Sequence, residues 1–269
     1  MFISHKYKAI FVHIQRTGGN SIQKIFEEFD PDLIETVPVD PSKNRTKHCY
    51  ISDIKAAVDE AVFERYVKFC VVRNPFDRMV SWYSHFKDRG NDEDARIRLN
   101  QGDRALRMYY RGLKILGRNS ELSAAYTKLW LRFSRMFKRF EPGSAEEVAI
   151  RFAAIGERVM SEVNKNASSF EEFVMLPRDY PGGIFERFYI DQAEYASHDG
   201  RLAMDRILKV ESLSQDFEAL AEQIGFEGRL PHVNRSSRKA RYQEYYNEKT
   251  RAIVAERFRR DCEYFGYSF

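Results

Sequence analysis

The feature that most constrains this chain is an apolar run near its start that leads into two adjacent glycines. Residues Ala9–Ile14 predict a short buried strand, and Gln15–Gly19 predict a tight turn. Asn20 or Ser21 is expected to cap the helix that follows, whose apolar face consists of Ile22, Ile25, Phe26 and Phe29. The first backbone N–H groups of a helix have no intrahelical acceptor, and the helix dipole adds positive potential beside them. The stretch therefore predicts a phosphate or sulfate site.

The residues of the turn also suit an anion. Gly18 and Gly19 allow unusual backbone angles and a close approach to a bound oxyanion. Arg16 adds a positive charge, and Thr17 and Ser21 add hydroxyl groups. The spacing is not that of a Walker loop, which has four residues between its glycines and then Gly-Lys-Ser/Thr. A tight connection without a ligand, as in any α/β protein, stays open as the alternative at this point.

A second predicted strand ends in a positive charge. Residues 66–72 are rich in β-branched side chains, and Arg73 follows them at the carboxyl end, where open α/β sheets bind ligands. Pro75 suits the first turn of the next helix, and Ser81 lies two turns into that helix. A guanidinium completed by a hydroxyl predicts a second phosphate site, with an ordinary surface ion pair of Arg73 as the alternative.

The charge of the chain is unevenly distributed. The 44 basic and 40 acidic residues give a formal net charge of +4. Between Arg96 and Arg139, however, there are twelve basic residues and only two acidic ones, a local net charge of +10. Apolar residues recur there at helical spacing and predict two basic amphipathic helices, with a third helix over 144–163. Either this is a basic surface for a polyanionic acceptor or a membrane, or it is an insertion with a solvated basic face.

Composition indicates a folded protein. The 269 residues suffice for one sizeable α/β domain, and 21 Phe, 15 Tyr and 2 Trp can build its core. Cys49, Cys70 and Cys262 show neither metal-type spacing nor a disulfide framework, and Cys70 is expected to be a packed thiol. Because we find no leader and no apolar stretch of spanning length, we expect a soluble cytoplasmic protein. Because no cluster of ligand residues has suitable spacing, we expect no bound metal.

Further elements are expected along the rest of the chain. In order, they are an extended segment to Pro41, a basic loop over 42–48, one helix from Ser52 or Asp53 to Tyr66, capping boxes at 169–172 and 212–215, a loop at 181–183, a strand over 206–211, a helix ending at Gly225, a loop over 230–238, and a final helix from about Glu244 that breaks by Gly266.

Five segments closely resemble the sulfotransferases, most of all the branch that includes carbohydrate and heparan-type O-sulfotransferases. They are Phe11–Ser21, Phe69–Tyr83, Val210–Phe217, Leu230–Ser236 and Asp261–Phe269. The resemblance covers nearly the whole chain except about 88–165. It implies a P-loop-like three-layer α/β fold, with a central, mostly parallel sheet flanked by helices. This would be a single domain over 1–269 with a basic helical insertion at about 88–165.

The resemblance also implies a donor, 3′-phosphoadenylyl sulfate (PAPS), and a product, adenosine 3′,5′-bisphosphate (PAP). The donor's 5′-phosphosulfate would lie on Arg16, Thr17, Gly18, Gly19, Asn20 and Ser21, its 3′-phosphate would lie on Arg73 and Ser81, and a loop with Arg235 and Arg238 would fold over it. Two departures stand out, because Gln15-Arg16 replaces the usual Pro-Lys of the family and Asn20 replaces Thr. Arginine keeps the charge as a planar fork, and asparagine still caps a helix.

The reaction that follows from this resemblance is an in-line transfer of a sulfuryl group to a hydroxyl. Arg16 and the N–H groups of the turn would stabilise the leaving group. His48 is predicted as the general base, because it follows a basic loop and matches a position where similar sequences carry a Lys-His pair. The alternative is a loop histidine that only positions substrate. Lys47 and His85 are predicted substrate contacts.

The acceptor is expected to be a hydroxyl on a carbohydrate or glycolipid, with no nucleic-acid partner. A peripheral membrane contact and a homo-oligomer both fit the basic helices. Two other functions compete. A kinase-like P-loop protein would bind ATP with Mg²⁺, but the chain lacks the Walker lysine and an obvious magnesium-binding acid. A non-catalytic polyanion-binding protein would use the basic helices, but it leaves the pairing of the glycine turn with Arg73 unexplained.

Overall fold

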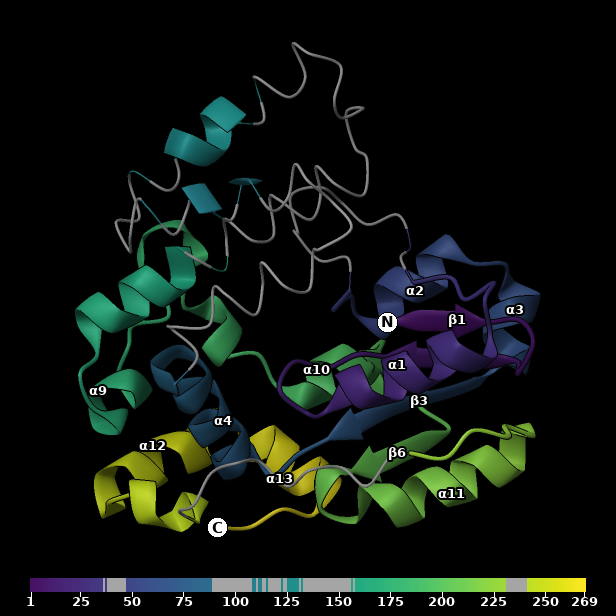
Figure 1. The fold of residues 1–269 in the computed structure, drawn as a ribbon. Coiled ribbons are helices and arrows are strands. Elements are labelled where there is room, and N and C mark those ends of the chain that lie inside the picture. Colours follow the sequence, from purple (N-terminus) through teal and green to yellow (C-terminus); the bar gives the residue numbers. More distant parts are fainter. Residues whose placement is uncertain are drawn as a thin grey trace. The chain divides into compact units, whose positions relative to one another are not determined.

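A computed structural model of the chain describes residues 1–35, 37, 47–88, 158–230 and 241–269, together with 108, 109, 111, 112, 115, 122, 125–130, 132 and 156. The chain divides into two compact units. One consists of Met1–Met79 and Ile190–Phe269, and the other of Val80–Tyr189. The central sheet lies in the first unit (Figure 1).

This sheet has four strands and is mostly parallel (Figure 1). The strands are β1 (Phe2–Ser4), β2 (Ala9–Val12), β3 (Val67–Val72) and β6 (Arg206–Lys209), and they lie in the order β1-β2-β3-β6. β2, β3 and β6 run parallel, and β1 is antiparallel to β2. The three predicted strands are confirmed, although β2 and β6 each end two residues earlier than expected. The three-residue strand β1 was not predicted.

Both faces of the sheet are buried, because alternate residues of its central strands belong to separate cores. In β2, Ile10 and Val12 lie in one core, and Ala9 and Phe11 lie in the other. Cys70 of β3 is fully buried, and burial raises the pKa of its thiol to about 12. The prediction of a packed thiol is therefore confirmed.

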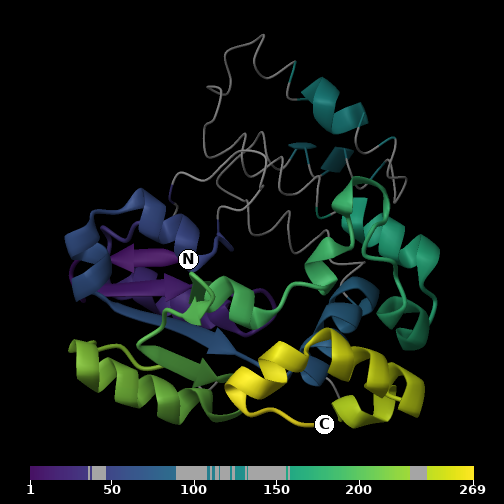
Figure 2. The ribbon, with the colours of Figure 1, turned by 180° about the vertical axis from the view of Figure 1, so that it is seen from behind.

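Helices cover both faces of the sheet (Figures 1 and 2). α1 (Gly19–Phe29) and α11 (Leu213–Ile224) supply side chains to the core that contains Phe11. The opposite core receives side chains from α2 (Ile51–Ala57), α3 (Glu60–Arg65), α10 (Gln192–Ala196) and α13 (Arg259–Phe265). The first unit is thus an α/β unit with a helical layer on each side of the sheet.

Two predicted helices are each split. The helix expected up to Tyr66 is interrupted at Val58, whose extended backbone (φ −120°, ψ 159°) ends α2 before α3 begins. A β-branched residue loses side-chain freedom in a helix, and Asp59 flanks the new helix start. The final helix is likewise wrong as one element, because the chain there forms a 3₁₀ turn (Tyr242–Tyr245), α12 (Glu248–Arg257) and α13.

The expected helix stops are confirmed, but one expected start is wrong. Gly225 and Gly266 both have left-handed backbone angles, with φ of 66° and 65°. At the start of α11, the Ser212 hydroxyl donates to Asp216 Oδ2 over 2.8 Å and makes no cap bond to the backbone. The capping box expected at 212–215 is therefore absent, because an acidic side chain one residue further along takes the hydroxyl.

Several short elements complete the first unit. Ser197–His198 (β4) and Arg201–Leu202 (β5) form a small antiparallel hairpin. Ile34 pairs with Ile3 as an isolated antiparallel bridge. Most of the extended segment expected beyond it, residues 42–46 of the basic loop, and residues 231–238 of the later loop lie outside the described residues.

The second unit is helical in the parts that the structure describes. It receives α4 (Pro75–Asp88) from Val80 onward and contains α9 (Phe170–Val174), the 3₁₀ turns Pro181–Gly183 and Glu186–Phe188, and helical residues 158–166. Half of the capping box predicted at 169–172 is confirmed, since Ser169 Oγ accepts from the N–H of Glu172 over 3.2 Å. The Glu172 side chain accepts instead from the N–H of Ser168, over 2.6 Å. Of the two basic helices and the third helix expected between 96 and 163, the described residues are helical and the rest lie outside them.

Candidate active site

The turn between β2 and α1 has an unusual backbone. Arg16 has φ 69° and Gly18 has φ 79°, both in the left-handed region, and α1 begins at Gly19. Asn20 and Ser21 are therefore inside the helix, and the predicted cap at either residue is wrong. Gly18 occupies the N-cap position without a side-chain bond, because the left-handed angle that a glycine adopts freely turns the chain into the helix.

Gly19 is required by what packs against it. A Cβ on Gly19 would lie 2.5 Å from Cδ2 and 2.7 Å from Nε2 of His13, a ring that is only 3% exposed. The first-turn N–H groups of Gly19 and Asn20 lie ahead of any intrahelical acceptor. The turn therefore carries backbone donors at the start of α1, with the His13 ring packed against Gly19.

The hydroxyls of the turn are placed differently from one another. Thr17 is fully buried, and its Oγ1 donates to the carbonyl oxygen of Ile14 over 3.0 Å. This bond joins the two ends of the turn, so the Thr17 hydroxyl is used in a hydrogen bond inside the protein. Ser21 is half-buried in the first turn of α1, and its N–H donates to Gly18 O over 3.1 Å.

Arg73 joins this turn from the neighbouring strand. It follows the carboxyl end of β3, which lies parallel to β2, and its Nη1 donates to the carbonyl oxygen of Arg16 over 3.3 Å. Its Nε donates to Asp77 Oδ2 over 2.6 Å, one turn into α4. The two arginines that the sequence assigned to opposite ends of a donor are thus linked. Ser81, on the same helix, is 7% exposed and belongs to the second unit.

A network of buried polar groups holds the backbone of Arg73 in place. The amide of Gln192 accepts from Arg73 N over 2.9 Å and donates to Arg73 O over 2.8 Å. Asp261 of α13 then accepts from Gln192 N over 2.9 Å and from Ala193 N over 2.8 Å. Burial raises the pKa of Asp261, against the opposing effects of the Arg78 guanidinium and these hydrogen bonds.

Arg78 connects the same network to the glycine turn. This side chain is 2% exposed, its Nε donates to Gln15 O over 3.0 Å, and its Nη1 donates to Ile190 O over 2.9 Å. Burial lowers its pKa, and the charge of Asp261 counteracts that effect. Sequence reasoning assigned no role to Arg78, Gln192 or Asp261. No local sequence pattern connects these three residues.

Asn74 ties later parts of the chain to the start of α4. Its N–H donates to Glu211 Oε1 over 2.9 Å, and its Nδ2 donates to Ser268 O over 2.8 Å and to the Tyr242 hydroxyl over 3.3 Å. Its Oδ1 accepts from Phe76 N over 3.0 Å. One asparagine beside Arg73 therefore fixes three distant segments.

His48 lies against the end of β2. Its Nδ1 is 2.8 Å from the carbonyl oxygen of His13, and the two imidazole rings are 4.6 Å apart between centroids, in an edge-on arrangement. A carbonyl oxygen can only accept, so Nδ1 carries the proton, and in the neutral ring Nε2 carries the lone pair. Burial and the neighbouring His48 lower the pKa of His13 far below its ordinary range. His13 is thus neutral beside the predicted base.

Lys47 and His85 lie in different units. Lys47 is half-buried, and burial lowers its pKa against the opposing charges of Glu27 and Glu35. His85 is half-buried on α4, with its ring 5.2 Å from that of Phe86 and 6.4 Å from that of Trp82. Arg235 and Arg238 lie outside the described residues.

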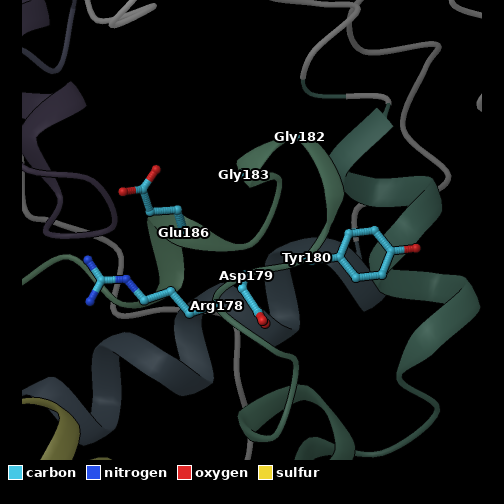
Figure 3. A pocket seen from close by; sticks show the side chains of 6 residues that line it. All are labelled: Arg178, Asp179, Tyr180, Gly182, Gly183 and Glu186. Carbon is cyan, nitrogen blue, oxygen red and sulfur yellow. The ribbon is translucent and has the colours of Figure 1, made fainter.

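The second unit has an open pocket of about 460 Å³ (Figure 3). It is lined by Arg178, Asp179, Tyr180, Gly182, Gly183 and Glu186. Tyr180 points away from Arg178 and Glu186, and its hydroxyl donates to Glu162 Oε2 over 2.6 Å. With one basic and two acidic side chains, this pocket has no positive excess, so we do not assign an anionic donor to it.

Metal-ligating clusters and membrane-crossing helices are both absent from the part of the chain that the structure describes. The described residues contain no group of three or more His, Cys, Asp or Glu side chains placed to hold a metal ion. None of the helices that the structure describes combines the length and apolar character needed to cross a membrane.

The mostly parallel sheet with helices on both faces is consistent with a sulfotransferase fold. The profile of the sulfotransferase family matches residues 1–268, which is nearly the whole chain. The chain belongs to the sulfotransferase family. Comparison with curated proteins and with solved structures gave no match.

Proposed function

We propose that this protein transfers a sulfuryl group from PAPS to a hydroxyl of a carbohydrate or glycolipid. The single observation that carries the proposal is that two segments, each with an arginine, meet at the carboxyl ends of β2 and β3. Arg16 in the glycine turn and Arg73 after β3 meet through the bond from Arg73 Nη1 to Arg16 O. A donor with two separated anionic ends needs two such segments side by side.

The turn suits the 5′-phosphosulfate of this donor. Its left-handed residues, Arg16 and Gly18, lead into the first turn of α1, where the N–H groups of Gly19 and Asn20 have no intrahelical acceptor and can donate to anionic oxygens. The donor supplies an activated sulfuryl group whose bond to the phosphate oxygen breaks as the bond to the acceptor oxygen forms. Arg16 and the N–H groups of Gly19 and Asn20 stabilise the negative charge left on that phosphate.

Arg73 serves the 3′-phosphate. Asp77 holds its Nε, and Gln192 holds its backbone on both sides, so the guanidinium is presented in a fixed orientation. Ser81, which lies on α4, is proposed as a second contact to the 3′-phosphate, as the family resemblance implies. Arg235 and Arg238 would close over the nucleotide.

His48 removes the proton from the acceptor hydroxyl. The carbonyl oxygen of His13 holds the proton on Nδ1, so Nε2 is the nitrogen with basic character. The hydrogen bond from His48 Nδ1 to the carbonyl oxygen of His13 also fixes the orientation of the His48 ring. Protonation of His13 beside it is disfavoured by burial, so its ring competes with His48 for no proton. Lys47 and His85 are proposed as substrate contacts.

The free thiols of Cys49, Cys70 and Cys262 fit a reducing compartment, and we propose a cytoplasmic location. A kinase-like function is less suited to this site, since the turn has an arginine and no Walker lysine. It remains an outcome of the test below.

The test is calorimetric titration with PAP and, separately, with ATP, both without added metal. Micromolar binding of PAP with little binding of ATP supports the two-anion site. Tighter ATP binding that depends on Mg²⁺ would assign the chain to phosphoryl transfer. Absence of binding by either nucleotide would leave a non-catalytic polyanion-binding function.

A further inference from the structure

The strongly basic segment carries most of the large apolar side chains that the described chain leaves exposed. Of seven such side chains, four lie here: Met108 (46% exposed), Ile115 (85%), Leu122 (51%) and Leu129 (64%). Met108 and Ile115 are helical residues seven positions apart, and so are Leu122 and Leu129. Single exposed apolar residues are ordinary, but a regular series in one short segment is not.

The inner side of the same helical stretches is already packed. Tyr109 is fully buried, its ring stacks on that of Tyr126 with centroids 5.7 Å apart, and its hydroxyl lies 2.8 Å from that of Thr127. Gly112 makes room for this contact, because a Cβ there would lie 2.1 Å from the Tyr126 hydroxyl oxygen. The packed seam therefore uses positions other than those of the exposed apolar side chains.

Basic side chains lie among the exposed apolar ones. Arg111 is exposed and falls between Met108 and Ile115 at helical spacings of three and four residues. Lys128 and Arg132 are exposed on either side of Leu129. The whole of 96–139 has a local net charge of +10. The exposed positions among these helical residues are therefore both apolar and cationic.

We propose that this surface docks on an anionic lipid bilayer. We call it the basic–apolar surface, and define it by Met108, Arg111, Ile115, Leu122, Lys128, Leu129 and Arg132. Apolar side chains that enter the acyl boundary, flanked by cations at the headgroups, are what an interfacial protein segment needs. The proposal does not depend on the sulfuryl-transfer reaction, so either can fail without the other.

Two other occupants explain less. A second copy of this chain would bring two segments of +10 charge together, which their mutual repulsion opposes. A dissolved polyanionic chain would pair with the basic side chains but would leave Ile115 and Leu129 in water. An anionic bilayer satisfies both kinds of side chain at once.

The test is sedimentation of the full chain with vesicles of phosphatidylcholine alone and with vesicles that contain an equal share of phosphatidylglycerol. We expect binding to the anionic vesicles only. The double variant Ile115→Glu/Leu129→Glu should weaken that binding by about tenfold or more at every salt concentration. The triple variant Arg111→Gln/Lys128→Gln/Arg132→Gln should weaken it and flatten its salt dependence.

A matched control separates a local effect from a general one. Met175→Glu changes an equally apolar residue, 45% exposed, outside the basic segment, and should leave vesicle binding unchanged. Circular dichroism and thermal melts establish that each variant is folded. The proposal is wrong if anionic vesicles do not bind, or if the Ile115/Leu129 variant binds them as well as the unaltered chain does.

The competing occupants give different results. Binding to heparin that is unaffected by Ile115→Glu/Leu129→Glu, without vesicle binding, would assign the surface to a polyanionic chain. A dimer in light scattering that the same variant dissociates would assign it to a second copy. Either result overturns the bilayer proposal.

Discussion

The Nδ1–H of His48 donates to the carbonyl oxygen of His13 over 2.8 Å, so the end of β2 determines which nitrogen of His48 can accept a proton. The same His13 places its ring where a side chain on Gly19 would be. One residue thus connects the proposed base with the helix start that would hold the donor. This relationship makes the proposed mechanism testable at each of its two ends.

Changing His48 to Ala should remove turnover and spare the nucleotide. We expect a loss of about 10²–10⁴-fold in kcat, since a general base contributes roughly that much, and little change in the affinity for PAP. Activity should also fall as the pH is lowered, because a protonated imidazole cannot accept the hydroxyl proton. Steady-state rates and calorimetry measure the two quantities. Full activity of His48→Ala, with the exposed His5→Ala as control, would show that the base is another group.

Changing Arg73 to Ala should weaken donor binding. The loss of a charge-assisted phosphate contact costs about 1.5–3 kcal/mol, or roughly ten- to a hundredfold in the Kd for PAP. Arg73→Lys should recover part of this, since it keeps the charge but loses the fork that Asp77 holds. Titration with PAP is the measurement, and equal affinities of all three proteins would contradict the assignment.

Changing Gly19 to Ala should disturb the turn through His13. The new methyl group would overlap that ring, and overpacking of this kind costs about 1–3 kcal/mol of unfolding free energy. PAP affinity should fall with it. Gly156→Ala is the control, because a Cβ there meets nothing within 4 Å, and it should not destabilise the fold. Chemical denaturation measures both variants, and an equal outcome for the two would remove the packing argument.

Changing Asp261 to Asn should destabilise the fold and loosen Arg73. The Asp261 carboxylate accepts hydrogen bonds from Gln192 N, Gln192 Nε2 and Ala193 N, and leaving such a buried donor without its acceptor costs about 1–3 kcal/mol. Glu256→Gln, in an exposed ion pair with Arg259, should change stability by less than about 1 kcal/mol. Urea unfolding compares them. If Asp261→Asn binds PAP as tightly as the unaltered chain, the network is structural only.

Asp191 should make stability depend on pH. Burial, aided by the nearby Asp261, raises the pKa of Asp191 to about 6. A carboxyl whose pKa is raised on folding favours the folded state at low pH, and that contribution disappears as the pH rises through 6. Asp191→Asn should therefore gain stability at pH 8 relative to pH 5. Because Asp191 is only about half-buried, we expect about 1 kcal/mol after allowance for solvent screening. Thermal melts at the two pH values decide it, and an equal gain at both would contradict the titration.

The strand–turn–helix site was predictable because its signals are local. The continuous apolar runs of β2 and β3, two adjacent glycines and an arginine after a strand are all visible in short windows of sequence. The predicted helix cap was misplaced by two or three residues, because α1 begins after a left-handed angle at Gly18 and without a side-chain cap. Backbone angles of this kind leave no distinct sequence pattern.

The buried network was not predictable for a different reason. Arg78 and Asp261 lie on helices far apart in the sequence, and in the sequence each resembles an ordinary charged residue on a helix surface. Only the fold places them together beneath Arg73. The same holds for Gln192, whose amide bonds both sides of the Arg73 backbone. Sequence periodicity assigns a face to each residue but does not pair two buried polar groups.

Asn74 has a consequence for the order in which the molecule forms. Its hydrogen bonds reach Glu211, Tyr242 and Ser268, which follow it by 137, 168 and 194 residues. During synthesis on the ribosome, the glycine turn and β3 emerge long before these partners do. The hydrogen bonds of Asn74 can therefore be completed only after residue 268 has been released. Contacts of such long sequence separation slow folding. Until they form, the strands synthesised first lack the hydrogen bonds that join Asn74 to the later segments.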